Sequence, residues 1–342
     1  MAVFCLRKLC YFVSIVSTMH TVNQLATYKK NLDTRWFVIK TIREFFWADN
    51  FCEVDAPTLM RLPGQEPYLS PMVLGVSDER GKKYRRFLHT SPEFAMKKLL
   101  AAGYHNIFYL GKCFRDFESF GGNHYPEFTM LEWYRTNVDY QKIMDDVENL
   151  FSLLAKKTGS HVLYFDSWER VSMKDLWQRY VGVDLGHYLT KEKMFSLCTM
   201  HGFSPLKHES FEDLFYRIFL NKIEPFLGKK VPTIVYGYPA QMAALAKLSE
   251  NDPRYAERFE VYIWGVEIAN AFSELTNGVE QYKRFVAEQA VRKKNNKPVY
   301  EIDQTFIEAV DMLPTCSGIA LGVDRVVQVF TGCKDIQNVI VS

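Results

Sequence analysis

The chain has 342 residues, of which 48% are hydrophobic, 24% charged and 15% aromatic, which is a globular composition large enough for one big domain or two ordinary ones. Its formal net charge is +2 and no long basic run occurs, so charge gives no reason to expect non-specific nucleic-acid binding. Seven cysteines are scattered without a C-x-x-C pair, which argues against a zinc site and against a secreted disulfide framework. We therefore expect a protein of the reducing cytoplasm.

The first residues loosely resemble a signal peptide, because a short apolar run follows Arg7 and Lys8. The run is too short to span a bilayer and no A-x-A-like cleavage site follows it. We expect either that Met19 is the true start or that residues 1–18 are a disordered extension. We accordingly assign residues 1–32 to an N-terminal extension and 33–342 to the folded domain. No other stretch is apolar enough to predict a membrane span.

Two helices are predicted in the first hundred residues. A spacing of three and four predicts an amphipathic helix over 34–49, with Asp33 or Thr34 as its N-cap. The apolar positions of this pattern are Trp36, Ile39, Ile42, Phe45 and Phe46. A second helix is predicted over 92–102, with Ser91 as N-cap, Pro92 in the first position and Gly103 as its end.

The segment "HYPEFTMLEWYR" predicts a β-strand that forms a hairpin with a strand at 106–117 across the loop "ESFGGNH". A period of two divides its side chains into two faces, both rich in large apolar groups, so we expect cover on both sides. One face holds Phe128, Met130, Glu132 and Tyr134, and the other holds Thr129, Leu131, Trp133 and Arg135. A buried Glu132 needs a cation or hydrogen-bond donors, which either a protein Lys or Arg or a ligand supplies.

The remaining pattern mixes helices and strands without repeats, so we expect one α+β domain. Helices are predicted at 139–157, within 191–227 and at 278–296; strands at 233–240 and 257–270; and a strand that turns into a helix at 317–330.

Several segments carry charged residues in a recognisable order, although each residue alone has an ordinary surface explanation. An amphipathic helix ending near a Pro is followed by "FRDFE", "HYPEFTMLEWY", "FE", "VEIANAFSEL" and "GIALGVDR". Together they resemble the three signature motifs of class II aminoacyl-tRNA synthetases, in particular the lysyl subgroup, over about residues 33–330. The resemblance implies an antiparallel sheet flanked by helices that holds ATP beside an amino acid.

By position in these motifs, the resemblance implies an ATP site with two catalytic arginines. Arg115 would bind the α-phosphate, and Arg325 would lie on the adenine or near the γ-phosphate; guanidinium groups suit both tasks. His124 would reach the terminal phosphates and Phe128 would stack on the adenine. Glu260 and Glu267 would hold Mg²⁺, a cation that prefers carboxylate and phosphate oxygens. The implied ATP-binding set is Arg115, Asp116, Phe117, Glu118, His124, Tyr125, Phe128, Glu267, Ile268, Gly322 and Arg325.

The resemblance also implies an acidic amino-acid pocket. Its residues are Ser91, Pro92, Glu93, Glu132, Tyr134, Asn270, Phe272 and Glu274. Carboxylates around one small cavity repel one another unless a cation is present, and a dibasic substrate brings two ammonium groups. Glu274 would hold the distal ammonium, and Glu93 with Glu132 would serve the other.

Lysyl-tRNA synthetases of this class carry an anticodon-reading domain before the first motif, and we expect none here because that motif begins near residue 33. The chain thus resembles the elongation factor P–lysine ligases, and Ala320 stands where the lysyl synthetases have Gly, as in those ligases. This resemblance implies ATP-dependent activation of (R)-β-lysine or lysine and its transfer to a lysine ε-amino group of elongation factor P. It implies no tRNA or membrane partner. We also expect a homodimer that forms through helix 34–49.

Some positions depart from the family pattern. The loop of the second motif is one residue longer than in the family, so either Phe117 or Glu118 reads the adenine. In addition, Tyr125 stands where the family has Asn, and Ala271 stands where it has Gly. Two other functions therefore stay open: a free-standing lysine-activating enzyme that acts on tRNA or another amine, and a catalytically silent protein that only binds.

Overall fold

The computed structural model describes residues 20–159 and 167–341. The prediction for residues 1–18 lies outside this range. Helix α2 (Val22–Thr27) precedes α3 (Lys29–Ala48), so the long helix begins before residue 33 and the predicted N-cap at Asp33 or Thr34 is wrong. Tyr28 is the N-cap residue and makes no side-chain capping bond. The chain turns at Tyr28 between α2 and α3, where the Tyr28 backbone N–H donates to the carbonyls of Gln24 and Ala26 in α2.

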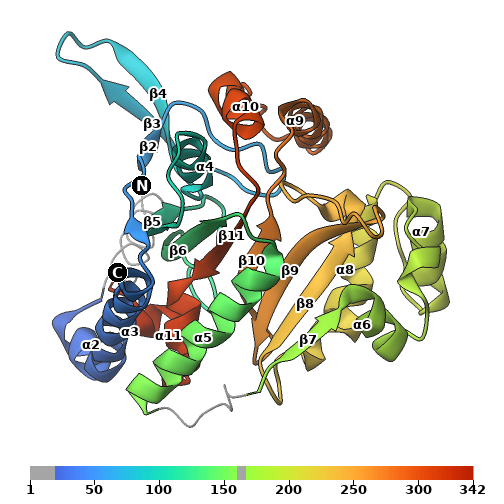
Figure 1. Cartoon of the computed structure of the whole chain (residues 1–342), viewed down its shortest axis with the longest axis horizontal. Coiled ribbons are helices and arrows are strands. Elements are labelled where there is room, and N and C mark those ends of the chain that lie inside the picture. The colour runs from blue at the N-terminus through green and yellow to red at the C-terminus, as the bar shows by residue number, and fades with distance from the viewer. Residues whose placement is uncertain (1–19, 160–166, 342) are drawn as a thin grey trace, which may run out of the picture.

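The core of the fold is an eight-stranded sheet in the order β1-β5-β6-β11-β10-β9-β8-β7 (Figure 1). Only the edge pairs β1–β5 and β7–β8 are parallel, so the expected antiparallel sheet is confirmed for the six central strands. The strands are β1 (Cys52–Glu53), β5 (Ile107–Phe114), β6 (Glu127–Thr136), β7 (Glu169–Ser172), β8 (Thr233–Pro239), β9 (Tyr255–Ile263), β10 (Val266–Ser273) and β11 (Cys316–Gly322). A small sheet, β2-β4-β3, projects from one corner and contains β2 (Leu59–Met60), β3 (Val73–Ser77) and β4 (Lys83–Leu88).

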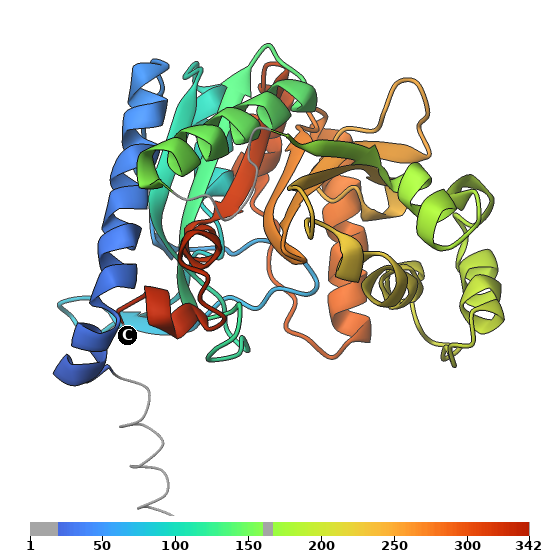
Figure 2. The same cartoon turned by 90° about the horizontal axis from the view of Figure 1, so that it is seen from below.

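Helices cover both faces of the sheet, as the residue pattern of β6 predicts. Leu131 and Trp133 pack in one core with α3, α5 (Tyr140–Thr158) and α11 (Val323–Thr331). Met130 and Tyr134 pack in a second core with α4 (Glu93–Ala101), α9 (Gly278–Lys294) and α10 (Gln304–Asp311). A third core joins β7 and β8 to α6 (Met173–Tyr180), α7 (Lys191–Met200) and α8 (Phe211–Lys222) at the far end of the sheet (Figure 2).

The predicted strand at 257–270 is wrong as a single element, because it is the hairpin of β9 and β10. The chain reverses at Trp264 (φ 56°) and Gly265 (φ 75°), two consecutive positive φ values that match the right-handed twist of a tight hairpin. A large aromatic residue rarely adopts such a φ, so the sequence gives no turn signal at Trp264.

A buried ion pair joins α3, β6 and α11. Arg35 on α3 pairs with Asp324 on α11 through its Nη1, and its Nη2 donates to the hydroxyl of Thr129 on β6 at 2.6 Å. Asp324 in turn accepts from the Thr129 backbone N–H at 2.8 Å. The side chains of Arg35 and Asp324 are only 4% and 2% exposed, so each charge depends on the other for its stabilisation.

None of the helices in the described part of the chain combines the length and apolarity needed to cross a lipid bilayer.

Replacing Arg35 by Met is expected to destabilise the protein by about 3–5 kcal/mol, because Asp324 is left as an unpaired buried charge. Urea unfolding measures this change. Lys29→Met is the matched control: it removes an exposed ion pair with Asp33 from the same helix and should cost less than ~1 kcal/mol. Equal unfolding midpoints for Arg35→Met and Lys29→Met would contradict the importance of the buried pair.

Candidate active site

The sheet presents most of the predicted site residues on one face, because directly paired residues on neighbouring strands point the same way. One row crosses the sheet as Glu132 (β6), Ala320 (β11), Asn270 (β10) and Glu260 (β9). The next row is Tyr134, Gly318 and Phe272. The two rows place the predicted amino-acid pocket and the predicted metal ligand on one continuous surface.

A β-bulge in β10 brings Glu267 to this same face. Glu267 pairs with Tyr262 and Ala269 pairs with Val261, so Ile268 is an extra residue in the ladder. In a regular strand, Glu267 and Asn270 would point to opposite faces, because they are three residues apart. The bulge reverses this relation, and Glu267 lines the same cavity as Asn270.

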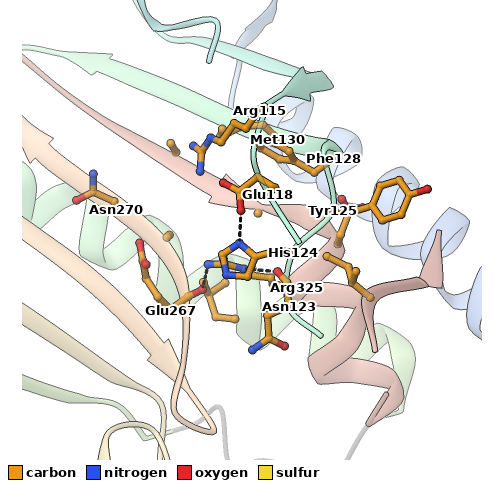
Figure 3. A pocket seen from close by; sticks show the side chains of 16 residues that line it. Arg115, Glu118, Asn123, His124, Tyr125, Phe128, Met130, Glu267, Asn270 and Arg325 are labelled. Carbon is orange, nitrogen blue, oxygen red and sulfur yellow. Dashed lines mark hydrogen bonds and ion pairs between the residues drawn. The ribbon is translucent and has the colours of Figure 1, made fainter. Parts of the chain in front are cut away.

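A cavity opens on this face between the loop after β5 and the β11–α11 junction (Figure 3). Its lining includes Arg115, Glu118, Asn123, His124, Tyr125, Phe128, Met130, Glu267, Ile268, Ala269, Asn270, Ala320, Gly322, Asp324, Arg325 and Ile336. Arg325 is anchored by two backbone carbonyls, those of Glu267 at 2.6 Å and Asn123 at 3.2 Å. The guanidinium therefore holds β10, the loop 118–124 between β5 and β6, and α11 together at the cavity.

His124 connects Arg325 to Glu118. Its Nδ1 lies 2.9 Å from the Glu118 carboxylate, and its Nε2 lies 3.4 Å from Nη2 of Arg325 (Figure 3). Burial and the Arg325 charge lower the pKa of His124 below its ordinary value, so the neutral ring is favoured. A ring that donates from Nδ1 to Glu118 leaves Nε2 as an acceptor for Arg325, which agrees with both contacts.

Glu118 therefore lies in the cavity, whereas Phe117 does not. The Phe117 side chain is 91% exposed, and its backbone has a positive φ of 62°. Asp116 also stays outside the lining, where its carboxylate accepts from the Phe117 N–H. Tyr125 borders the cavity, but its ring points outward in Figure 3 and packs edge-on against Phe120 at 5.4 Å.

Arg115 lies over the ring of Phe128, with 4.9 Å between the guanidinium carbon and the ring centroid. Its Nε is buried and has no hydrogen-bond partner among the described residues. A buried donor without a partner is costly, so this atom fits a ligand that supplies an acceptor oxygen at the cavity.

The two predicted metal ligands differ in availability. Both oxygens of Glu260 accept from protein donors: Tyr238 at 2.5 Å, Tyr262 at 2.6 Å and Arg258 at 2.8 Å. Glu267 has no such partner in the described ranges, and burial together with Glu260 raises its pKa. Those ranges hold no cluster of three or more potential metal-ligating side chains.

Glu132, a carboxylate of the predicted amino-acid pocket, is buried. It accepts hydrogen bonds from the Ser91 hydroxyl and, at 3.3 Å, from the Tyr134 hydroxyl. No ion pair reaches Glu132 from any residue that the structure describes, so the alternative of a partnering protein cation finds no support. Burial and the nearby Glu93 raise the pKa of Glu132 to about 8, so the protonated carboxyl group is favoured at neutral pH.

The protein cation of this pocket is Lys97, which pairs with the other two carboxylates. Its Nζ lies 2.6 Å from Glu93 Oε1 and 2.6 Å from Glu274 Oε2. Lys97 was not among the predicted site residues, although its spacing of four residues from Glu93 on a helix predicts such a pair. Arg258 was not predicted either; it bridges Glu260 to Asn270 at 2.8 and 2.9 Å and lies two residues before Glu260 on the same strand.

Ser91 and Pro92 lead into α4 one position later than predicted. Pro92 is the N-cap residue, so the assignment of Ser91 as N-cap is wrong. Ser91 accepts from the Glu93 N–H at 3.0 Å while it donates to Glu132. One serine therefore orients both the start of α4 and the Glu132 carboxyl group.

The fold and the two adjoining sites are those of a class II synthetase-type, ATP-dependent ligase, and the family model of class II tRNA synthetases (D, K and N) matches residues 18–341. The chain is 38% identical to the elongation factor P–(R)-β-lysine ligase of Yersinia enterocolitica over 91% of this chain and 94% of that protein. It is also 38% identical to the protein of the same name from Pseudoalteromonas translucida, over 90% and 94% of the two chains. The chain belongs to the family of elongation factor P–(R)-β-lysine ligases.

Gly318 leaves the space that the Tyr134 ring occupies. A Cβ at Gly318 would lie 2.2 Å from Cε1 of Tyr134 and 2.8 Å from Oε1 of Glu274. We expect Gly318→Ala to destabilise the protein by about 1–3 kcal/mol, the usual cost of overpacking, and to displace Tyr134 from Glu132. Thermal unfolding measures the effect. Gly75→Ala on β3 is the control, because its Cβ meets nothing within 4 Å; equal effects of the two substitutions would contradict this role of Gly318.

Proposed function

We propose that this protein activates (R)-β-lysine, or lysine, with ATP and transfers it to the ε-amino group of a lysine on elongation factor P. The names of its relatives support both the amino acid and the acceptor. The observation that carries the proposal is the division of charge on one sheet face. An acidic pocket around Glu132 adjoins a cavity with two arginines, Arg115 and Arg325.

The pocket suits an amino acid with two ammonium groups. Glu274 is proposed to bind the distal ammonium, because its Oε1 is buried without a hydrogen-bond partner among the described residues and lies beside the Tyr134 ring. Glu132, with Glu93, is proposed to serve the second ammonium. Asn270 borders both the pocket and the cavity, so the substrate carboxylate is proposed to lie on this side, toward ATP.

The first step is the attack of the substrate carboxylate on the α-phosphorus of ATP, which forms an aminoacyl-adenylate and releases pyrophosphate. Arg115 is proposed to stabilise the charge that develops on the α-phosphate, and Phe128 to stack on the adenine. Arg325 and His124 are proposed to bind the terminal phosphates. Glu267, with Glu260 behind it, would hold Mg²⁺, which supplies positive charge to the phosphate oxygens.

In the second step, a lysine amine of the acceptor attacks the carbonyl carbon of the mixed anhydride. The bond from this carbon to the phosphate oxygen breaks, AMP leaves, and the amine loses a proton to solvent. No covalent intermediate with the enzyme is required, so the chain contributes position and charge rather than a nucleophile.

Ala320 is proposed to influence which lysine isomer fits. It pairs with Glu132 on one side and Asn270 on the other, so its methyl group is proposed to lie between the second ammonium group and the carboxylate of the substrate. One methyl group in a close-fitting pocket changes discrimination by about 10- to 200-fold. We infer a preference for (R)-β-lysine from this position and from the names of the relatives.

The intact mass of elongation factor P tests the proposal after incubation with the protein, ATP, Mg²⁺ and either lysine isomer, with tRNA charging measured in parallel. We expect a gain of one lysyl mass and no charged tRNA. Arg115→Ala should lower lysine-dependent pyrophosphate exchange by about 100- to 1,000-fold. Arg179→Ala, which removes an exposed ion pair between Arg179 on α6 and Glu169 on β7, should leave the exchange unchanged.

If tRNA is charged while elongation factor P stays unmodified, the acceptor is tRNA and not the factor named in this proposal. Absence of lysine-dependent pyrophosphate exchange would instead identify a silent, binding-only protein and would overturn the proposed activity.

We propose a cytoplasmic homodimer, formed through α3. This helix lies along one edge of the molecule (Figures 1 and 2), and Trp36 and Trp47 are each 53% exposed. They are eleven residues apart, which is close to three helical turns, so they point the same way. Trp36, predicted as part of the helix's apolar stripe, therefore does not face the core of its own chain. Large exposed aromatic groups on one stripe suit an isologous interface.

Sedimentation velocity tests the dimer at micromolar concentration. The wild-type protein should sediment as a dimer, and the double variant Trp36→Glu/Trp47→Glu should sediment as a folded monomer. Leu220→Glu, at an exposed apolar position on α8 at the other end of the molecule, should remain dimeric. A monomeric wild type, or a dimeric double variant, would contradict an interface through α3.

A further inference from the structure

Arg258 on β9 is a mostly buried arginine that the proposed mechanism does not use. Its side chain is only 12% exposed, and all three nitrogens of its guanidinium donate hydrogen bonds within the chain. Nε donates to Oδ1 of Asn270 at 2.9 Å, Nη2 to Glu260 at 2.8 Å and Nη1 to the Met242 carbonyl at 2.6 Å. An effect of Arg258 on a bound ligand would therefore pass through one of these partners.

The Arg258 guanidinium is held in one orientation from its face and from its edge. The ring of Tyr238 lies over it, with 4.7 Å from the guanidinium carbon to the ring centroid. Glu260, which binds the edge, is itself fixed by the hydroxyl groups of Tyr238 at 2.5 Å and Tyr262 at 2.6 Å. A planar guanidinium with fixed partners is a preorganised donor. The Nε–H of Arg258 is therefore set toward Asn270 before a ligand binds.

This contact decides which end of the Asn270 side chain is available to a ligand. A guanidinium donates hydrogen bonds and accepts none, so the amide atom that faces Nε of Arg258 must be the oxygen. The NH2 group is then the end of the amide that Arg258 leaves free. No described residue accepts a hydrogen bond from this NH2 group, and Asn270 lines the cavity (Figure 3). A ligand in the cavity thus meets a hydrogen-bond donor at Asn270.

A donor at this position suits the carboxylate of the proposed substrate. Along one row of the sheet, Glu132 and Asn270 lie on either side of Ala320. The carboxyl group of Glu132 suits an ammonium group, whereas the amide NH2 group of Asn270 suits a carboxylate. An amide turned the other way would present its oxygen to the substrate carboxylate, and two acceptors that face each other repel. The orientation of one amide therefore determines whether this end of the pocket accepts an acid.

We propose that Arg258 positions the Asn270 amide so that its NH2 group binds the carboxylate of the amino-acid substrate beside ATP. Arg258 is a positioning residue, because it touches neither the substrate nor ATP and acts through Asn270. The inference rests on the proposed function, since it assumes that an amino acid is activated in this site. It adds to that function a residue that sets how the reacting carboxylate is presented to the α-phosphorus.

Arg258 also has a route to the ATP side of the site, through Glu260. The two routes differ in what they change: loss of the Asn270 contact weakens binding of the amino acid, whereas loss of the Glu260 contact weakens binding of ATP with Mg²⁺. Glu260 keeps two hydroxyl donors, Tyr238 and Tyr262, when Arg258 is replaced. Oδ1 of Asn270 has no second donor among the residues that the structure describes. We therefore expect the amino acid, rather than ATP, to be affected.

Lysine-dependent pyrophosphate exchange tests the proposal with Arg258→Met, Asn270→Ala and the double variant. Arg258→Met should raise the KM for lysine about tenfold or more, the usual effect of losing one hydrogen bond to a charged group, and should change the KM for ATP little. The double variant should be no worse than Asn270→Ala alone, because Arg258 acts through Asn270. Losses that multiply in the double variant, or a wild-type KM in Arg258→Met, would overturn the proposal.

Cadaverine, which is lysine without its carboxylate, separates positioning from a general loss of structure. It lacks the group that Asn270 binds, so its inhibition constant should be the same for Arg258→Met and the wild type. An equal weakening of lysine and cadaverine would indicate a merely structural role of Arg258 and would contradict the proposal. Arg254→Met is the matched control: Arg254 lies just before β9, pairs with Asp252 at 2.6 Å and is 55% exposed, so both constants should stay at their wild-type values.

Asn270→Asp keeps the proposal testable if Arg258→Met does not fold. The substitution exchanges the NH2 group for an oxygen, while Arg258 binds the other oxygen. The substrate carboxylate then meets a like charge, so the KM for lysine should rise at least about 100-fold, whereas inhibition by cadaverine should not weaken. An unchanged KM for lysine would overturn the assigned orientation. Wild-type protein without lysine-dependent exchange would overturn the proposed function itself, whereas wild-type exchange with contrary responses of the variants would overturn only this inference.

Discussion

The buried ion pair between Arg35 and Asp324 is the interaction on which the rest of the site depends. It joins the long N-terminal helix to the helix that follows β11, and through Thr129 it joins both to the central strand β6. Because neither charge is stable in the core alone, the three elements must assemble together. Arg325 follows Asp324 directly in the chain, so the pair that secures the fold also determines where this cavity arginine lies.

Charge is separated along one face of the sheet, and both ends are organised before a substrate arrives. At one end, backbone carbonyls hold the Arg325 guanidinium at the cavity. At the other end, hydroxyl groups and Lys97 orient the carboxylates. Fixed dipoles and charges of this kind need little reorganisation during a reaction, which is the usual source of electrostatic catalysis. This organisation has a cost, because burial raises the pKa values of Glu132 and Glu267. A substrate ammonium near Glu132 and a metal ion near Glu267 would each favour the ionised carboxylate.

Much of the site was predictable because its residues lie in short segments with a clear period. The two faces of β6 follow from alternation alone, and the structure confirms the burial of Met130 and Glu132 on one face and of Leu131 on the other. The helix caps were less predictable, since Tyr28 and Pro92 make no side-chain capping bond that a sequence pattern would indicate. The β9–β10 hairpin was missed because Trp264 occupies a backbone conformation that is unusual for its residue type.

The sequence by itself determined the order of the elements, the apolar faces and the kinds of charged groups available, because these depend on near neighbours and on residue type. The tertiary structure alone decided which charges meet. The bulge at Ile268 turns Glu267 toward Asn270. The contact of Lys97 on α4 with Phe272 on β10 accompanies its ion pair with the distant Glu274, whereas no described residue forms an ion pair with Glu132. Such choices depend on sheet register and on long-range burial, which no local pattern contains.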